Sequence, residues 1–368
     1  MFHPVIERHL SMLLGNQPRL SLALMPLLSW CLPGYRPGYY RARVLSVHPD
    51  GATSYSLWLK PAANWPGFVP GQSIELGFDN KGRWLSRRFS ISSSLQQWQR
   101  EGQIRLTIKI NPQGQLSRQL PKLIAEGALR WLSISPAAGD FQWHSPASSS
   151  LMLAAGSGIT PLASMLLSQR CWTAPVTLLY YVRQQAEAAL LAELQQLASA
   201  QPLFRLQLVE TASAGRQPFA EVLPDAADSQ QLLTCGPYAF TEAALAFGAA
   251  CGLKPADCQR EFFHLPPLVE TAGDQQWQVR WQMAEQQVVS DVNASQSLLD
   301  QAEQAGLQPS FGCRMGVCYQ CVCQKESGVV LNLRTGQRST AGAEQIQLCV
   351  SVPQSALSIR LGVSDASF

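Results

Sequence analysis

The sequence has little net charge and few charged side chains. Its formal net charge is +3, and charged residues make up 14% of the 368 residues. Nucleic-acid-binding proteins usually carry a strongly basic domain or a basic patch. We therefore expect no nucleic-acid partner.

Long apolar runs are also lacking. The nearest candidate for a membrane helix, Leu20 to Leu32, contains Pro26 and is shorter than the roughly 20 apolar residues that a span requires. It also lacks the small-residue cleavage site of a signal peptide. We therefore expect a cytoplasmic protein, in which clustered cysteines more often bind metal than form disulfides.

Changes of pattern divide the chain into parts. Between Tyr40 and Phe141, short runs with a period near two are separated by turn residues, which is typical of an all-β barrel or sandwich. From Leu151 onward, apolar strands alternate with helical segments, which indicates βαβ units and a parallel sheet. After Pro266-Pro267, a hairpin, a helix, a cysteine-rich loop and closing strands follow. The length alone supports two or three domains.

We predict four segments from these changes. They are an N-terminal extension (1–37), an antiparallel β-barrel (38–143), an α/β domain with a parallel sheet (144–267) and a C-terminal α+β domain (275–368). Residues 268–273 are the expected linker before the last domain.

Four of the ten cysteines have a spacing typical of a metal site. Three follow the pattern C-x4-C-x2-C and the fourth lies downstream: Cys313, Cys318, Cys321 and Cys349. This is the plant-type arrangement for a [2Fe–2S] cluster. A structural zinc site also takes four thiolates and stays an alternative, although zinc sites more often show two C-x2-C pairs.

The segment Arg87 to Ser93 combines an arginine, an aromatic ring and several hydroxyls. These groups suit the phosphates, the ring and the N5 edge of a flavin. Successive side chains of a strand point to opposite faces of the sheet. Arg87 and Phe89 can therefore contact the same ligand as Ser90 only if the chain bends. An ordinary strand with a serine-rich turn is an equally good interpretation of the residues alone. Gly114-x-x-Ser117, which opens an expected helix, is either a phosphate site or a simple N-cap.

Two further motifs follow expected strands of the parallel sheet. Gly156 to Pro161 (G-S-G-I-T-P) precedes a helix, where glycines and a helix N-terminus suit a pyrophosphate, but it lacks the third glycine of G-x-G-x-x-G. Cys235-Gly236-Pro237 follows the fourth strand, and Cys235 alone reads equally as a buried free thiol. Arg183 ends the second strand, where it would meet an adenosine ribose or its 2′-phosphate, or simply lie on the surface.

Taken in order, these motifs resemble those of the ferredoxin–NADP reductase family, and Ser297 to Cys321 with Cys349 resembles plant-type ferredoxins. The resemblance covers about residues 38–368. It implies an FAD-binding barrel, an NAD(P)-binding α/β domain and a β-grasp ferredoxin domain. The implied cofactors are FAD, a [2Fe–2S] cluster and NADPH, with NADH as the alternative.

The resemblance also implies roles for single residues. The flavin would be bound by Arg87, Phe89, Ser90, Ser93, Gly114 and Ser117. The nucleotide would be bound by Gly156, Gly158, Thr160, Pro161, Arg183, Cys235, Gly236 and Pro237. The cluster would be bound by Cys313, Cys318, Cys321 and Cys349. In the reaction Ser90 would bond the flavin N5 region, while Thr160 and Cys235 would frame the nicotinamide. Phe89 stands where the family more often has tyrosine.

The implied function is an NAD(P)H-dependent reductase that passes electrons through flavin and cluster to a partner. Fusions of this kind resemble reductase components of oxygenases and of acyl-lipid desaturases. We expect a membrane di-iron fatty-acid desaturase as the acceptor, for two reasons. Residues 1–36, with Leu20 to Leu32, would lie on the inner face of the cytoplasmic membrane, unless this run simply packs on the barrel. Asn64-Trp65-x-Gly67 also looks like desaturase-linked reductases.

Two other functions stay open. The acceptor would alternatively be a soluble aromatic-ring or acyl-CoA oxygenase. From a different class, the chain would be a non-catalytic redox-sensing electron carrier, although the complete reductase motifs speak against this.

Overall fold

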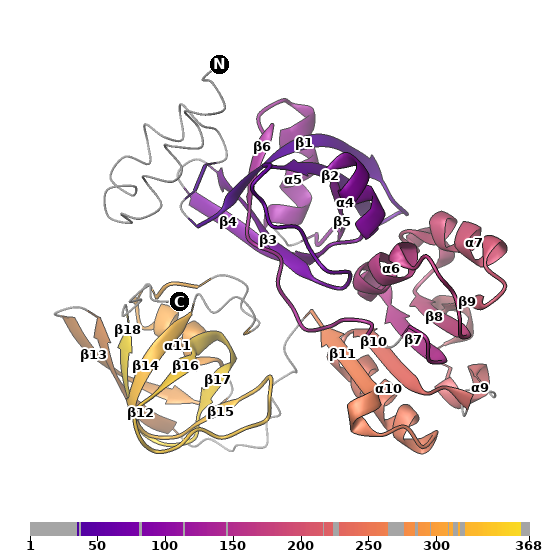
Figure 1. Ribbon diagram of the computed structural model, residues 1–368. Helices are drawn as coiled ribbons and strands as arrows, with labels where there is room; N and C mark the ends of the chain where they lie inside the picture. Colours follow the sequence, from indigo (N-terminus) through magenta and orange to yellow (C-terminus); the bar gives the residue numbers. More distant parts are fainter. Residues whose placement is uncertain are drawn as a thin grey trace. The chain divides into compact units, whose positions relative to one another are not determined.

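The computed structural model describes residues 35–361, apart from residues 37, 81–82, 113–114, 145, 216, 224–227, 264–275, 284–285, 295, 308, 312–315 and 317–320. The chain forms two compact units, Met1–Phe262 and Phe263–Phe368 (Figure 1). The first unit contains the barrel and the parallel sheet, and the second contains the ferredoxin-like domain, so the predicted three-domain fold is confirmed. The predicted boundaries between the domains stay predictions. Leu20 to Leu32 lies outside the described residues.

Six antiparallel strands form the first sheet, in the order β4-β3-β6-β1-β2-β5. They are β1 (Tyr40–Pro49), β2 (Ser54–Pro61), β3 (Ser73–Asn80), β4 (Arg83–Ser90), β5 (Ile104–Lys109) and β6 (Trp131–Ile134). A bridge between Ile91 and Leu106 brings the two ends of this order together and closes the barrel. Alternate side chains point inward, as the period of two predicts, and fill the core with residues such as Leu57, Leu76 and Ile108. Two helices interrupt the strands, α4 (Leu95–Glu101) and α5 (Gln115–Ala125).

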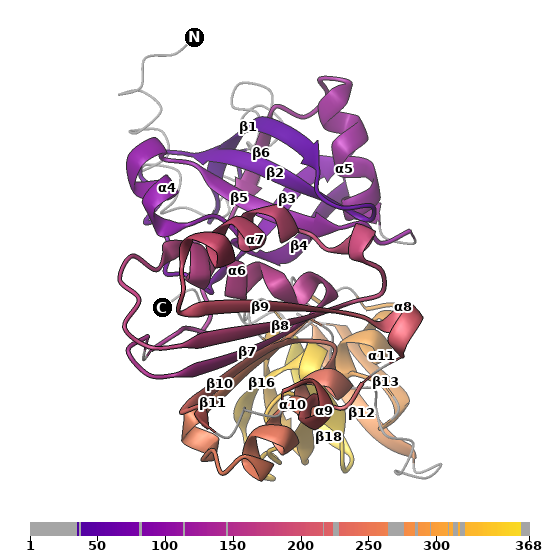
Figure 2. The same cartoon turned by 90° about the vertical axis from the view of Figure 1, so that its right-hand side faces the viewer.

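A five-stranded parallel sheet follows, in the order β11-β10-β7-β8-β9 (Figure 2). Its strands are β7 (Ser150–Ala155), β8 (Val176–Val182), β9 (Phe204–Glu210), β10 (Gln231–Gly236) and β11 (Cys258–Phe262). The helices between them are α6 (Ile159–Ser168), α7 (Leu191–Ala200), α8 (Thr211–Ala214), α9 (Phe219–Val222) and α10 (Tyr238–Ala250). Short 3-10 turns are η1 (Gly156–Gly158), η2 (Gln185–Glu187) and η4 (Pro255–Asp257). The strand order changes direction between β7 and β10, and ligands of such sheets bind at the carboxyl ends of the strands at this point.

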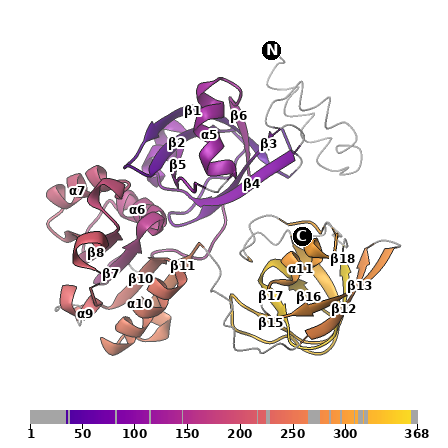
Figure 3. The same ribbon diagram turned by 180° about the vertical axis from the view of Figure 1, so that it is seen from behind.

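The second unit is a mixed sheet in the order β13-β12-β18-β14-β16. Its strands are β12 (Gln276–Met283), β13 (Gln286–Asn293), β14 (Val322–Ser327), β16 (Glu344–Gln347) and β18 (Leu357–Leu361). A two-stranded sheet lies beside it, formed by β15 (Val330–Asn332) and β17 (Ser351–Pro353) (Figure 3). One helix, α11 (Leu298–Gln304), buries Leu298 and Ala302 against Trp281 and Ile359, and the turn η5 (Leu348–Val350) precedes β17. This arrangement is the expected β-grasp domain.

Among the described residues, the structure contains no helix of the length and apolar character needed to cross a membrane.

Candidate functional site

The glycine-rich loop after β7 presses against the end of β10. A Cβ atom added at Gly158 would lie 2.0 Å from the carbonyl oxygen of Cys235, so only glycine permits this approach. Gly156 has a φ of +54° and open space where a Cβ would lie, which suits the close approach of a ligand. The hydroxyl of Thr160 donates to the carbonyl oxygen of Ser157 at 3.0 Å and closes the loop. The predicted nucleotide motif therefore forms a backbone cradle at the start of α6, with Pro161 buried in its first turn.

The Cys-Gly-Pro turn completes the other side of this crevice. Gly236 ends β10, and a Cβ there would lie 2.9 Å from that of Ala155, so the turn also depends on a glycine. Pro237 precedes α10, and its carbonyl oxygen accepts hydrogen bonds from two backbone N–H groups of the first turn. The structure thus brings both predicted nucleotide motifs together at the change of strand order.

Cys235 lies at the carboxyl end of β10 and is fully buried. Burial, together with the carboxylate of Glu261 on the neighbouring strand, raises the pKa of its thiol well above the usual range. The side chain is therefore a neutral thiol at physiological pH. It is suited to packing beside a flat ring and unsuited to acting as a nucleophile.

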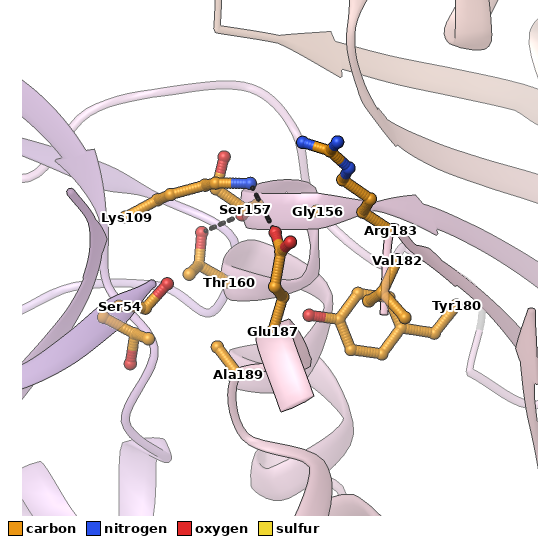
Figure 4. Close-up of a pocket in the computed structure, with 11 residues that line it drawn as sticks. Ser54, Lys109, Gly156, Ser157, Thr160, Tyr180, Val182, Arg183, Glu187 and Ala189 are labelled. Carbon is orange, nitrogen blue, oxygen red and sulfur yellow. Dashed lines mark hydrogen bonds and ion pairs between the residues drawn. The ribbon is translucent and has the colours of Figure 1, made fainter. Parts of the chain in front are cut away.

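A pocket opens between the barrel and the carboxyl ends of β7 and β8. It is lined by Ser54, Thr107 and Lys109 of the barrel and by Gly156, Ser157, Thr160, Tyr180, Val182, Arg183, Glu187 and Ala189 of the parallel-sheet domain. Figure 4 shows Lys109 entering from the barrel side, with Arg183 and Glu187 opposite. The Lys109 ammonium lies 3.4 Å from the Glu187 carboxylate. Two cations and a helix N-terminus around one pocket suit a phosphate-bearing ligand.

The predicted flavin motif lies at the end of β4. Ser90 is 4% exposed, and its hydroxyl is buried with no hydrogen-bond partner in the described structure. A buried hydroxyl without a partner is costly, so the Ser90 hydroxyl is suited to donate a hydrogen bond to a bound ligand. Phe89 is half-buried against the barrel core, whereas Arg87 is exposed.

The neighbouring Arg88, which the motif leaves out, has a structural role. Its Nε atom donates to the Ser73 hydroxyl at 2.7 Å, and its Nη2 atom donates to the Ala138 carbonyl at 2.9 Å. It therefore holds the bridge between these two segments. Arg87 stays the candidate for the flavin phosphates.

Two predicted flavin residues make hydrogen bonds inside the protein. Ser93 is 0% exposed, and its hydroxyl accepts a hydrogen bond from the backbone N–H of Arg105 at 3.1 Å. Ser117 lies in the first turn of α5, where its hydroxyl accepts from the backbone N–H of Asn111 at 3.0 Å. Both contacts shape the loops around the site, and direct flavin contacts of these hydroxyls stay predictions. Gly114 lies outside the described residues.

The predicted cluster site is described at two of its four cysteines. The Sγ atoms of Cys321 and Cys349 lie 3.2 Å apart and both residues are buried, so one iron ion fits between two such thiolates. The backbone N–H of Gly316 donates to Cys349 Sγ at 3.3 Å, a contact that stabilises thiolate sulfur. Cys313 and Cys318 lie outside the described residues.

Comparison with known proteins agrees with this geometry. Residues 152–245 match the oxidoreductase NAD-binding domain family, and residues 283–354 match the 2Fe-2S iron-sulfur cluster binding domain family. An NADPH oxidoreductase of Mycobacterium tuberculosis is 32% identical over 341 residues, which cover 90% of this chain and 88% of that protein. The chain belongs to the ferredoxin-reductase type of NAD(P)H oxidoreductases with a C-terminal 2Fe–2S domain.

Two further relatives support the same architecture. The vanillate O-demethylase oxidoreductase of Pseudomonas putida is 32% identical over 212 residues, which cover 58% of this chain and 65% of that protein. The solved structure of phthalate dioxygenase reductase shares the fold, with a TM-score of 0.60, 20% identity and coverage of 89% of this chain and 98% of that one.

Membership in this family decides several alternatives. The protein is an NAD(P)H oxidoreductase that uses FAD and a [2Fe–2S] cluster, so the zinc and the non-catalytic interpretations are wrong. These relatives give no support to the expected fatty-acid desaturation.

Some residues of the site were not predicted from the sequence. Lys109 and Glu187 line the pocket, and Arg105 joins the barrel to the parallel-sheet domain. Their partners are far away in the chain, and nothing in their local sequence distinguishes them from ordinary charged residues. Only the tertiary structure reveals these contacts.

Proposed function

We propose that this protein is the reductase component of an oxygenase, to which it delivers electrons one at a time from its iron–sulfur cluster. The observation that carries this proposal is the combination of both catalytic modules with relatives named as reductases of a demethylase and a dioxygenase. A soluble aromatic-ring or demethylating oxygenase is the acceptor class that these relatives suggest.

Three groups of residues would bind the nucleotide, the flavin and the cluster. A bound FAD would supply the chemistry that converts two-electron hydride transfer into single-electron transfer to the cluster. The loop Gly156 to Thr160 would hold the nucleotide phosphates, and the neutral thiol of Cys235 would pack at the nicotinamide end. The Ser90 hydroxyl would donate to the N5 edge of the flavin. Cys321 and Cys349, with Cys313 and Cys318, would hold the cluster.

The motif that suggested a desaturase has a structural explanation. Trp65 is 3% exposed, its indole N–H donates to the Ser135 carbonyl at 3.0 Å, and its ring packs edge-on against Trp98. A Cβ at Gly67 would lie 2.9 Å from the Trp98 ring nitrogen. These residues build a corner of the barrel, so their pattern does not require a particular electron acceptor.

The acceptor can be tested with the purified protein and cell fractions. The reductase is added to a soluble fraction with methoxylated aromatic acids, and to a membrane fraction with acyl-CoA. Oxygen uptake and product are measured with NADPH and with NADH. We expect stimulated, nucleotide-dependent demethylation or hydroxylation in the soluble fraction. Stimulation confined to acyl-chain desaturation in the membrane fraction would contradict the proposal.

A cluster-free variant, Cys349→Ser, serves as the matched control in both fractions. It should retain electron transfer from NAD(P)H to ferricyanide, because that reaction needs only the flavin, and it should support no oxygenase turnover.

A further inference from the structure

A buried arginine joins the barrel to the parallel-sheet domain. Arg105 lies on β5 and is 4% exposed. Its guanidinium donates two hydrogen bonds to the two carboxylate oxygens of Glu193, in the first turn of α7. A pairing of two planar groups through two parallel bonds fixes orientation as well as distance. The pair therefore determines how β5 lies against α7.

The same arginine holds the segment that follows β4. Its Nη2 atom donates to the Ser92 carbonyl at 3.0 Å, and its backbone N–H donates to the Ser93 hydroxyl at 3.1 Å. Its own carbonyl oxygen accepts from the backbone N–H of Ser92 at 2.9 Å. Ser92 and Ser93 come soon after Ser90, which ends β4, so Arg105 holds the segment that continues from Ser90.

Helix α6 makes a second connection to this segment. The hydroxyl of Ser164 donates to the Ser93 carbonyl at 2.8 Å, and both residues are 0% exposed. Helix α6 starts directly after the loop Gly156 to Gly158. The predicted flavin contact and the nucleotide loop are thus linked through this buried hydrogen bond and a few residues of backbone on either side of it.

Other contacts join the same two domains without touching this segment. Asp50 accepts from the backbone N–H of Leu190 at 2.8 Å, and the backbone N–H of Leu95 donates to the Ser168 hydroxyl at 2.8 Å. Joining the domains therefore does not by itself require Arg105. Its Nε atom is buried with no hydrogen-bond partner in the described structure, which makes a buried guanidinium a costly choice for packing alone.

We propose that Arg105 is a positioning residue for hydride transfer. With Glu193, it sets the place of Ser90, and of a flavin held there, relative to a nucleotide at the Gly156 loop. The transfer breaks the C4–H bond of the reduced nicotinamide and forms an N5–H bond on the flavin. The hydrogen and both electrons move together, so the nucleotide is oxidised by two electrons and the flavin is reduced by two.

Hydride transfer depends strongly on geometry, since a displacement of about 1 Å can lower a rate about 100-fold. The inference rests on the reductase activity and on the predicted flavin contact of Ser90. It does not depend on the nature of the final acceptor.

The test compares Glu193→Gln with a matched control, Glu126→Gln. The amide that replaces the Glu193 carboxylate keeps the shape of the side chain but loses the charge, and Glu193 is 45% exposed, so we expect the variant to fold. The Glu126 carboxylate forms an exposed ion pair with the Lys122 ammonium, at 3.8 Å. Neither residue takes part in the contacts described above between the barrel and the parallel-sheet domain. Flavin reduction by NAD(P)H is measured without oxygen in a stopped-flow instrument, where no partner protein is needed.

We expect E193Q to slow flavin reduction about 10-fold while the nucleotide dissociation constant and FAD content stay within about two-fold of the parent. The flavin reduction rate of Arg105→Lys should lie between those of the parent and E193Q. Lysine keeps the positive charge opposite Glu193 but cannot make the two parallel bonds. The E126Q control should match the parent. Hydrogen–deuterium exchange of residues 90–106 should be faster in E193Q than in E126Q.

Two results would overturn the inference. One is a flavin reduction rate in E193Q like that of the parent, even with a lowered melting temperature, which would leave Arg105 a purely stabilising role. The other is loss of FAD from E193Q, which would show that the pair supports flavin binding rather than alignment. Neither the rate of flavin reduction nor the hydrogen–deuterium exchange needs an oxygenase, so a failed oxygenase assay would not affect this test.

Discussion

Gly158 and Cys235 meet so closely that a Cβ atom on Gly158 would lie 2.0 Å from the Cys235 carbonyl oxygen. This contact joins the two nucleotide motifs at the change of strand order between β7 and β10. It explains why the loop contains a glycine at a position whose φ of −62° any residue can adopt. The requirement at Gly158 is steric, whereas the requirement at Gly156 is conformational, since its φ is +54°.

The substitution Gly158→Ala should separate these two requirements. The added methyl group would force the loop away from β10, and we expect the KM for NAD(P)H to rise at least about 10-fold. Gly156→Ala tests the conformational requirement: its methyl group meets no protein atom, so it should cost about 1–2 kcal/mol of stability from the left-handed backbone. The same methyl group would enter the space left for the ligand, so the KM for NAD(P)H should rise in this variant as well. Steady-state ferricyanide reduction and thermal unfolding of both variants measure this. Equal KM values for G158A and the parent would contradict the steric argument.

Cys235 should not react with alkylating reagents in the folded protein. Burial and Glu261 raise the pKa of its thiol, so the thiolate needed for reaction is scarce between about pH 6 and pH 9. The exposed Cys171 is the internal control. Iodoacetamide labelling read by mass spectrometry should modify Cys171 and leave Cys235 intact. Labelling of native Cys235 near neutral pH would refute this.

The raised pKa of the Cys235 thiol also predicts how the stability of the protein changes at alkaline pH. The pKa of the thiol is raised in the folded state, so the unfolded state loses its proton first as the pH rises above about 8.5. The contribution of Cys235 to stability is therefore complete below that pH and is lost progressively above it. Urea unfolding at several pH values should show a shallower alkaline decline in Cys235→Ala than in the parent.

The sequence motifs indicated the correct fold because they combine local geometry with chemistry. The loop Gly156 to Pro161 and the spacing of the cysteines are local patterns, and they lie within the two regions that match the family models, residues 152–245 and 283–354. Helix α4 was missed because its residues show no apolar periodicity. Its only signals were the N-cap Ser94, which accepts from the Gln97 N–H at 3.2 Å, and the left-handed Gly102 after its end.

The contact between the barrel and the parallel-sheet domain could not be predicted from sequence patterns. Arg105 and Glu193 are 88 residues apart, and each looks like an ordinary charged residue in its own element. Burial of the arginine depends on how two separate domains pack, which no local pattern encodes. Lys325, a fully buried lysine in the ferredoxin-like unit, also went unnoticed in the sequence, because its partners Thr340 and Gly342 lie 15 and 17 residues further along the chain.

Lys325 should stabilise the ferredoxin-like unit through carbonyl contacts. It is 0% exposed, and its ammonium donates to the carbonyl oxygens of Thr340, at 3.0 Å, and of Gly342. Lys325→Met would leave these carbonyls without that donor, and we expect a loss of about 1–3 kcal/mol. Glu344→Gln should cost less, because the Glu344 carboxylate, 3.3 Å from the ammonium, is partly exposed. Denaturant unfolding followed by cluster absorbance compares them, and equal losses would contradict this assignment.

Cys349 and Cys323 are both buried in the ferredoxin-like core but should behave differently when replaced. Cys349 lies 3.2 Å from Cys321 and accepts the Gly316 N–H, whereas Cys323 falls outside the C-x4-C-x2-C spacing and packs in the core of the unit. Cys349→Ser should therefore abolish the [2Fe–2S] absorbance and cytochrome c reduction, while flavin reduction by NAD(P)H continues. Cys323→Ser should retain both the cluster and cytochrome c reduction. Loss of the cluster in C323S but not in C349S would reverse the ligand assignment, because a cluster of four thiolates requires each of its ligands.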